Sequence, residues 1–451
     1  MMYTKDTIVA IATPQGNGGI GIVRMSGTDA LQIANAITDK QLKPRHATFT
    51  NISYKNETID NGIAMYFKAP FSYTGEDIVE IQAHGNAFVL NLIIKATIAN
   101  GARMAKAGEF TERAFLNNKL DLAQAEAVAD IINASSETAA KSAAKSLQGD
   151  FSKEINNLLE KLIYLRMYVE ASIDFPEEEI NFLEDKKIHT SLENIYTTIL
   201  DVKTSTKQGA ILAEGITLIL VGKPNAGKSS LLNALAGKDT AIVTDIAGTT
   251  RDIVKEHIQI NGVPMHIIDT AGLRDSQDII ESEGIKRAIK KIQEADQVLF
   301  VTDDHIKSKV ALSDLKEIIP EFHNQIPHNI DITYVHNKID LLSEVPTNTD
   351  DHIYISAENG FGIDKLKKHI LDKVGYTSQN ESIYTARERH VEAINNAYTH
   401  ILLAKKQLNL GNGELLAEEL LIVQDYLNSI TGEFSSDDLL GEIFSSFCIG
   451  K

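Results

Sequence analysis

The stretch GKPNAGKS, residues 222–229, follows the apolar run GITLILV and precedes the helical pattern SLLNALAG. It has the spacing G-x-x-x-x-G-K-S/T through Gly222, Gly227, Lys228 and Ser229. Glycines let backbone N–H groups curl around phosphate oxygens, the start of a helix favours negative charge, and lysine neutralises the outer phosphates. The stretch therefore predicts a phosphate-binding loop, with Ser229 as a ligand of Mg²⁺.

Short apolar runs alternate with helical segments on the C-terminal side of this loop. The runs are MHIID (265–269), VLFVTDD (298–304), DITYVHNKID (331–340) and DHIYISAENG (351–360). Such alternation is typical of a doubly wound α/β domain of the Ras-like P-loop kind. Asn261-Gly262 tolerates the positive φ angles of a type I′ turn, so we expect a hairpin there and one antiparallel edge strand.

Two later motifs point to guanine. Asp340, in Asn337-Lys338-Ile339-Asp340, can accept hydrogen bonds from both N1–H and the amino group of guanine, a pair of donors that adenine lacks. In Ser356-Ala357-Glu358, the backbone N–H of Ala357 can donate to the guanine O6, while the stem of Lys338 can lie along the base. The motifs together predict a GTP hydrolase; the alternative is an inactive G domain.

The remaining phosphate-side motifs are DTAG (269–272) and TDIAGTTRD (244–252). Asp269 can hold the Mg²⁺ water shell, Gly272 can contact the γ-phosphate, and Thr250 can complete the Mg²⁺ shell. Leu273 stands where many small GTPases carry a water-orienting glutamine, so hydrolysis needs another route. The residues expected to contact GTP are Asn225, Ala226, Gly227, Lys228, Ser229, Ser230, Thr244, Asp245, Ile246, Ala247, Gly248, Thr249, Thr250, Asp269, Thr270, Ala271, Gly272, Asn337, Lys338, Asp340, Ser356 and Ala357.

The composition argues against several classes of protein. The net charge of −18 argues against a broad basic surface for nucleic acid, which depends on clustered Lys and Arg. A single cysteine cannot form an intramolecular disulfide, and no apolar run reaches the length of a membrane span, so we expect a cytoplasmic protein.

Changes in local composition and hydrophobic spacing along the chain predict a multidomain protein with an inserted domain. Residues 1–118 mix short apolar runs with Gly-rich turns, as in an α+β domain. Residues 119–210 and 377–451 are rich in Ala, Glu, Leu and Lys at helical spacing. The α/β domain at 211–376 therefore interrupts a helical domain.

The chain resembles the MnmE (TrmE) family of tRNA-modification GTPases through GKPNAGKS, TDIAGTTRD, DTAGLR, the α/β insertion and the terminal FCIGK. The resemblance implies a homodimer in which K⁺ takes the place of an arginine finger when two G domains meet. It also implies that K⁺ is held by the Asn225 and Thr249 side chains and by the Thr244 and Ile246 carbonyls. Glu281 matches the family's water-orienting glutamate, although by itself it could be a charge near a helix N-terminus.

The resemblance also implies a site for 5-formyl-tetrahydrofolate or a related one-carbon folate on the N-terminal domain. The matching residues are Arg24, Glu80, Lys119 and Lys451. Arg24 and Lys119 suit the carboxylates of a folate tail, and Glu80 could accept from the pterin amino groups. By themselves the first three would be solvated surface charges.

The implied activity is addition of a carboxymethylaminomethyl-type group at C5 of the wobble uridine of certain tRNAs. The implied partner is the flavoprotein MnmG, in a heterotetramer, with FAD on the partner. One alternative is a ribosome-assembly GTPase, which usually carries a module rich in Lys and Arg. Another is a scaffold in which bound GTP orders partners without meaningful turnover.

Cys448, close to the C-terminus, has two interpretations. A free thiol buried against the last helix is the favoured one, and a reactive nucleophile with a lowered pKa is the alternative. The terminal CIGK formally fits a prenylation motif, but Lys is not among the favoured final residues.

Overall fold

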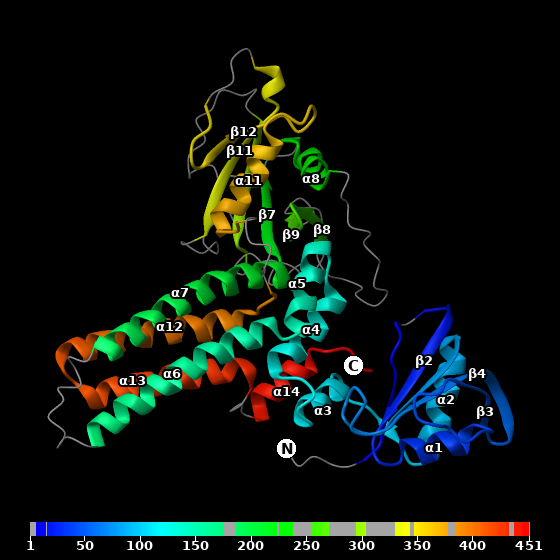
Figure 1. Cartoon of the computed structure of the whole chain (residues 1–451). Coiled ribbons are helices and arrows are strands. Elements are labelled where there is room, and N and C mark those ends of the chain that lie inside the picture. Colours follow the sequence, from blue (N-terminus) through cyan, green and yellow to red (C-terminus); the bar gives the residue numbers. More distant parts are fainter. Residues whose placement is uncertain are drawn as a thin grey trace, which may run out of the picture. The chain divides into compact units, whose positions relative to one another are not determined.

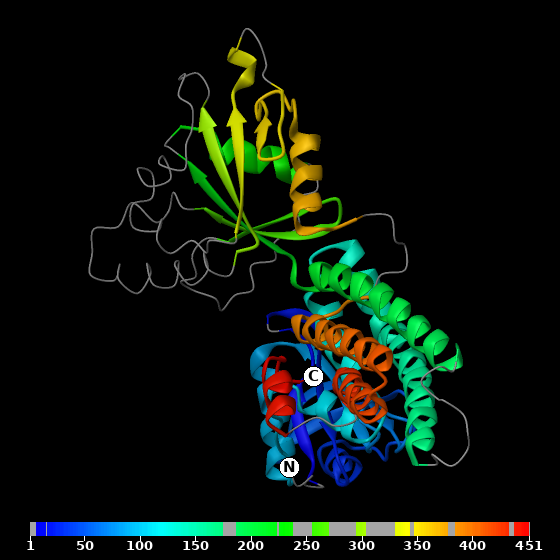
Figure 2. The same cartoon turned by 90° about the vertical axis from the view of Figure 1, so that its left-hand side faces the viewer.

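The computed structural model describes residues 6–14, 16–174, 186–222, 225–237, 255–269, 295–303, 330–342, 347–377, 384–432 and 437–450. The chain divides into two compact units (Figures 1 and 2). The first unit comprises residues 1–129, 147–196 and 396–451, and the second comprises residues 130–146 and 197–395. Among the described residues, no helix is long and apolar enough to cross a membrane.

The first unit contains a six-stranded sheet in the order β3-β4-β5-β2-β1-β6. Its strands are β1 (Ile8–Ile11), β2 (Gly18–Ser26), β3 (Thr48–Tyr54), β4 (Glu57–Phe67), β5 (Ile78–Gly85) and β6 (Arg103–Met104). Only the β1–β6 pair is parallel. The mixture of this sheet with helices confirms the α+β prediction.

The two faces of this sheet follow from the alternation of side chains along each strand. Helices α1 (Ala30–Ile37) and α2 (Ala87–Ala99) cover one face, where Val9 and Val23 pack into their core. Ile8 and Ala10 face the other way and pack against Phe110 of α3 (Glu109–Leu116). Arg24 lies opposite Ala10 in the register, which places it on the α3 side.

The rest of the first unit is helical. The long helices α6 (Asp150–Asp174) and α13 (Gly413–Thr431) pack along each other, and α14 (Asp437–Ser445) packs near the start of α4 (Leu122–Asn133). Helices α7 (Lys186–Glu214) and α12 (Glu388–Leu410) contribute residues to both units, and α5 (Glu137–Leu147) lies almost wholly in the second. These helices confirm the helical texture on both sides of the insertion (Figure 1).

The second unit is built on a sheet in the order β12-β11-β10-β7-β9-β8. Its strands are β7 (Ile216–Gly222), β8 (Lys255–Ile260), β9 (Val263–Asp269), β10 (Gln297–Asp303), β11 (Asp331–Asn337) and β12 (His352–Tyr354). All pairs are parallel except β8–β9, whose turn has φ values of 52° at Asn261 and 81° at Gly262. The doubly wound prediction and the antiparallel edge strand are confirmed.

Helices α8 (Lys228–Ala236) and α11 (Ile363–Val374) pack against this sheet and against each other (Figure 2). The phosphate-binding stretch lies between the carboxyl end of β7 and the first turn of α8. The carboxyl ends of β10 and β11 lie beside it, since Phe300–Val221 and Asp303–Asn337 are register partners. The sheet thus gathers three loops at one edge, where ligands of doubly wound folds bind.

Candidate functional site

In the described part of the loop between β7 and α8, residues 225–227, the backbone has two positive φ angles. Gly227, the N-cap residue of α8, has a φ of 91°, and a Cβ at this position would overlap the Nδ2 atom of Asn337. Asn225 also has a positive φ, 64°, and its side chain is exposed. The Lys228 ammonium donates to the Gly222 carbonyl at 3.0 Å. The glycine at the start of the helix is therefore required by conformation and by the close approach of Asn337.

Asn337 joins three parts of this site. Its side chain is buried, with 2% exposure, and its Nδ2 atom donates to the Ala226 carbonyl at 3.0 Å. Its Oδ1 atom accepts from the backbone N–H of Ala357, also at 3.0 Å. One amide thus fixes the phosphate loop to the loop after β12. The sequence placed Asn337 among the GTP-contacting residues, and the structure gives it a second role as the link between loops.

Asp340 is exposed in the short helix Ile339–Leu341, and its orientation is set by a buried neighbour. The hydroxyl of Ser356 donates to the Asp340 Oδ1 atom at 2.5 Å, and Ser356 is fully buried. A carboxylate that is exposed and held in one orientation suits the paired N–H donors of a base such as guanine.

Lys338 forms an ion pair that the sequence did not predict. Its Nζ atom lies 2.6 Å from the Asp303 Oδ2 atom, and its backbone is left-handed with a φ of 63°. Asp303 ends β10 in register with Asn337 at the end of β11, and carboxyl ends of parallel strands share one edge. A charged residue at a strand end was the signal that could have revealed Asp303. The pair holds the end of the Lys338 side chain beside the carboxyl end of β10.

Several predicted site residues lie outside the described residues. They are Thr244, Asp245, Ile246, Ala247, Gly248, Thr249, Thr250, Thr270, Ala271, Gly272, Leu273, Glu281 and Lys451, together with the side chain of Asp269. Ser229 and Ser230 lie exposed in the first turn of α8. Of the expected ion ligands, the described part of the chain therefore contains Ser229 for Mg²⁺ and Asn225 for K⁺.

A second cluster of predicted residues lies on the α3 side of the N-terminal sheet. Arg24 on β2 and Glu80 on β5 are register partners, and the Arg24 Nε atom donates to Glu80 Oε1 at 2.8 Å. The guanidinium carbon of Arg24 lies 5.8 Å from the ring centres of both Tyr73 and Phe110. The paired Arg24 and Glu80 side chains therefore lie near two aromatic rings, those of Tyr73 and Phe110.

Lys119 approaches the same region through a neighbouring loop. It is exposed, and its Nζ atom donates to the Pro70 carbonyl at 3.1 Å. Asn117, two residues before it, donates from Nδ2 to the Thr74 carbonyl at 2.7 Å. Loop 69–77, which carries Tyr73, is thus bonded to the segment that carries Lys119.

Cys448 is exposed, so the favoured prediction of a buried thiol is wrong. The tail is held by its backbone: Gly108 N–H donates to the Cys448 carbonyl at 3.4 Å, and Ile449 forms an antiparallel bridge with Ala107. Phe447 is buried, whereas Cys448 beside it is exposed. The apolar pattern of the last helix does not extend to this short strand-like tail, which explains the error.

Comparison with known proteins gives matches along nearly the whole chain. The family model for the N-terminus of GTP-binding protein TrmE matches residues 7–119, and the MnmE helical domain model matches residues 122–448. The tRNA modification GTPase MnmE of Francisella tularensis subsp. holarctica (strain FTNF002-00 / FTA) is 84% identical over 450 residues, covering 100% of both chains. The protein of the same name from Francisella philomiragia subsp. philomiragia is 83% identical, again over 100% of both chains.

Among solved structures, the G domain of the T. maritima FeoB iron transporter is similar to 35% of this chain and 98% of its own, with 23% identity and a TM-score of 0.25. A similarity this low does not indicate a shared activity. The fold of the second unit rests instead on its own strand order and loops.

Proposed function

Because this chain belongs to the MnmE family of tRNA modification GTPases, we propose that it is a potassium-dependent GTPase acting on the wobble uridine of certain tRNAs. GTP hydrolysis in the service of tRNA modification follows from the family itself. The proposal adds the ion, the dimer, the folate and the protein partner. It assigns dimerisation and folate binding to residues 1–118 and nucleotide binding to residues 211–376, within a helical domain formed by 119–210 and 377–451.

The geometry around Asn337 is the observation that supports this proposal most directly. Its buried amide bonds to the phosphate loop at Ala226 and to the base loop at Ala357. Asp340, oriented by Ser356, then accepts from the N1–H and amino group of guanine. Lys228 and the amides at the start of α8 stabilise the charge that develops on the phosphates during transfer.

The described ion ligands suit the ions proposed. The exposed hydroxyl of Ser229 is an oxygen ligand of the kind Mg²⁺ takes beside phosphates, and the exposed amide of Asn225 offers an oxygen to K⁺. Bound beside the phosphates, K⁺ would supply the positive charge that an arginine finger supplies in other GTPases. Thr244, Ile246 and Thr249 complete the proposed K⁺ set, Thr250 the Mg²⁺ set, and Glu281 orients the water.

The modification chemistry is proposed to be shared with a partner. A one-carbon folate held by Arg24, Glu80, Lys119 and Lys451 carries the carbon, and FAD on MnmG carries the redox step. The net charge of −18 fits a heterotetramer in which the partner supplies most of the basic surface for tRNA. We propose that the complex works in the cytoplasm and adds a carboxymethylaminomethyl-type group at C5 of the uridine.

The test of the GTPase proposal is hydrolysis by the full chain in KCl and in NaCl at equal ionic strength. We expect turnover that is fast in K⁺ and slow in Na⁺, and Asn225→Ala should remove the difference while retaining GTP binding. Equal rates in the two salts would rule out the ion, and no turnover in either would favour the scaffold alternative. Nucleoside analysis of tRNA from cells lacking the protein tests the substrate.

A further inference from the structure

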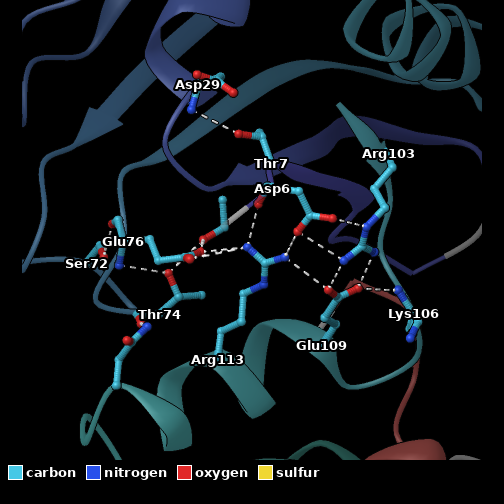
Figure 3. A network of polar contacts seen from close by, with 12 residues as sticks. Asp6, Thr7, Asp29, Ser72, Thr74, Glu76, Arg103, Lys106, Glu109 and Arg113 are labelled. Carbon is cyan, nitrogen blue, oxygen red and sulfur yellow. Dashed lines mark hydrogen bonds and ion pairs between the residues drawn. The ribbon is translucent and has the colours of Figure 1, made fainter. Parts of the chain in front are cut away.

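A network of charged side chains ties together four segments on the α3 side of the N-terminal sheet (Figure 3). Arg103 pairs with Asp6 and Glu109, and Arg113 pairs with Asp6, Glu109 and Glu76. Arg113 is 3% exposed, and its three partners lie before β1, at the start of α3 and in loop 69–77. Buried charges of this kind persist only where each is paired.

Within this network Glu76 is the one acid that belongs to loop 69–77. The Arg113 Nη1 atom lies 3.0 Å from Glu76 Oε2, which also accepts from the Ser26 hydroxyl at 2.7 Å. The Ser26 hydroxyl is in turn 2.7 Å from the hydroxyl of Thr74. Ser26, Thr74 and Arg113 are all buried. Glu76 therefore links the loop to α3 and to β2 through contacts that are shielded from solvent.

The same loop and the same helix carry the two rings that lie near Arg24. Tyr73 lies in the loop three residues before Glu76, and Phe110 lies on α3 three residues before Arg113. The Tyr73 hydroxyl is bonded to Thr111 of α3 at 2.8 Å. The separation of the two rings is thus set by how the loop is fastened to α3. The Arg113–Glu76 ion pair is the charged contact among those that join the loop to α3.

We propose that Glu76 and Arg113 are positioning residues for ligand binding at Arg24 and Glu80. They contact the loop and the helix rather than the ligand, and they hold Tyr73 and Phe110 at the spacing that aligns the Arg24 guanidinium with Glu80. The proposal rests on the proposed function, since the ligand is the folate assigned to this site. A site whose supporting residues are loosened binds less tightly even when every contact residue is present.

Glu109 provides the contrast that separates positioning from stability. It accepts from Arg113 at 3.1 Å and from Arg103, but it lies on α3 itself, four residues before Arg113. Glu109→Gln therefore removes one negative charge from the same network without cutting the link between loop 69–77 and α3. Glu76→Gln removes one charge and weakens the charged contact that joins that loop to α3. The two substitutions are chemically matched.

The experiment is calorimetric titration of 5-formyl-tetrahydrofolate into the full-length protein, with the thermal midpoint of unfolding measured for each variant. We expect Glu76→Gln to weaken folate binding about tenfold. Glu109→Gln should change the affinity less than about twofold, although it should lower the thermal midpoint at least as much as Glu76→Gln does. In an Arg24→Lys background, Glu76→Gln should add less than about twofold, because the residue that it aligns is already altered. If Glu76→Gln does not fold, Ser26→Ala replaces it in the test. This substitution removes the hydrogen bond from Ser26 to Glu76, and it should also weaken folate binding.

The outcomes separate this inference from the proposed function. If the unchanged protein does not bind the folate, the folate proposal fails and this one with it. If it binds and Glu76→Gln binds equally well, or if Glu109→Gln weakens binding as much, the positioning role alone is overturned. Full additivity of Glu76→Gln and Arg24→Lys would also overturn it.

Discussion

The contact between Ser356 and Asp340 predicts the result of changing Asp340 to asparagine. The Ser356 hydroxyl is buried, donates to Asp340 Oδ1 at 2.5 Å and accepts from the Asn359 N–H at 3.4 Å. In Asp340→Asn the amide has one oxygen, and Ser356 favours its placement at the Oδ1 position. The NH₂ group then faces the base, where guanine presents N1–H and its own amino group.

The magnitude follows from the hydrogen bonds that are lost. Two bonds to a charged carboxylate contribute about 1.5–3 kcal/mol each, so their loss amounts to about 3–6 kcal/mol. Because Asp340 is exposed to solvent, we expect the lower end, which is about a 10²-fold weaker Kd for GDP. Xanthine has a carbonyl in place of the amino group and can accept from the new NH₂, so its nucleotides should bind more tightly than to the unchanged protein.

The assay is equilibrium titration of GDP and of xanthosine diphosphate with each protein in the presence of Mg²⁺. Asp351→Asn is the matched control, since it removes the same charge from the same unit at an ion pair with Lys373, 3.0 Å away. The control should retain the affinity of the unchanged protein for both nucleotides. If Asp340→Asn bound GDP as tightly as the unchanged protein, or if the two variants changed alike, the reasoning about Asp340 would be refuted.

Three further predictions concern other parts of the molecule. Asn337→Ala removes two buried hydrogen bonds and should lower the free energy of unfolding of the second unit by about 2–4 kcal/mol, measured by urea denaturation with the unchanged protein as reference. Cys448, the chain's single cysteine, should react with one equivalent of a thiol reagent in the native protein at the rate of an exposed thiol; a rate that rises only on unfolding would contradict its exposure. Burial alone would raise the pKa of Glu109, but hydrogen bonds led by that from Arg103 hold it below the ordinary value. The ionised Glu109 therefore stabilises the fold fully above its unfolded-state pKa, and this stabilisation is lost as pH falls through the lower folded-state pKa. The thermal midpoint of unfolding should accordingly drop at acidic pH. The drop should be less steep in Glu109→Gln, which lacks the titrating group.

The fold was largely predictable because its signals are local. The alternation of apolar runs and helical segments in residues 211–376 corresponds to a mainly parallel sheet, and Asn261-Gly262 forms the expected hairpin with its antiparallel edge strand. Turn chemistry and hydrophobic periodicity act over a few residues, so a single sequence displays them. The phosphate-binding stretch was identified for the same reason, since its glycines and lysine are adjacent in the chain.

The contacts that hold the sites together were not predictable, because they join distant segments. Asn337 and Ala226 are 111 residues apart, and Arg113 and Glu76 are 37 residues apart. Such bonds depend on which strands become neighbours and in which register, information that no short pattern contains. Asp303 shows the intermediate case. Its position at a strand end was visible in the sequence, but its pairing with Lys338 required the order of β10 and β11.

The bonds of Asn337 have a consequence for how the nucleotide site discriminates. Its amide is shared between the backbone of the phosphate loop and the backbone of the base loop, so neither loop can shift without straining or breaking a buried hydrogen bond. A buried bond of this kind is costly to leave unmade. In the proposed nucleotide site, a base that fits poorly against Asp340 and Ala357 would therefore disturb the alignment of the phosphates as well as lose its own contacts. With the site residues proposed above, selection for guanine by one loop and placement of the phosphates by the other would thus be coupled through Asn337.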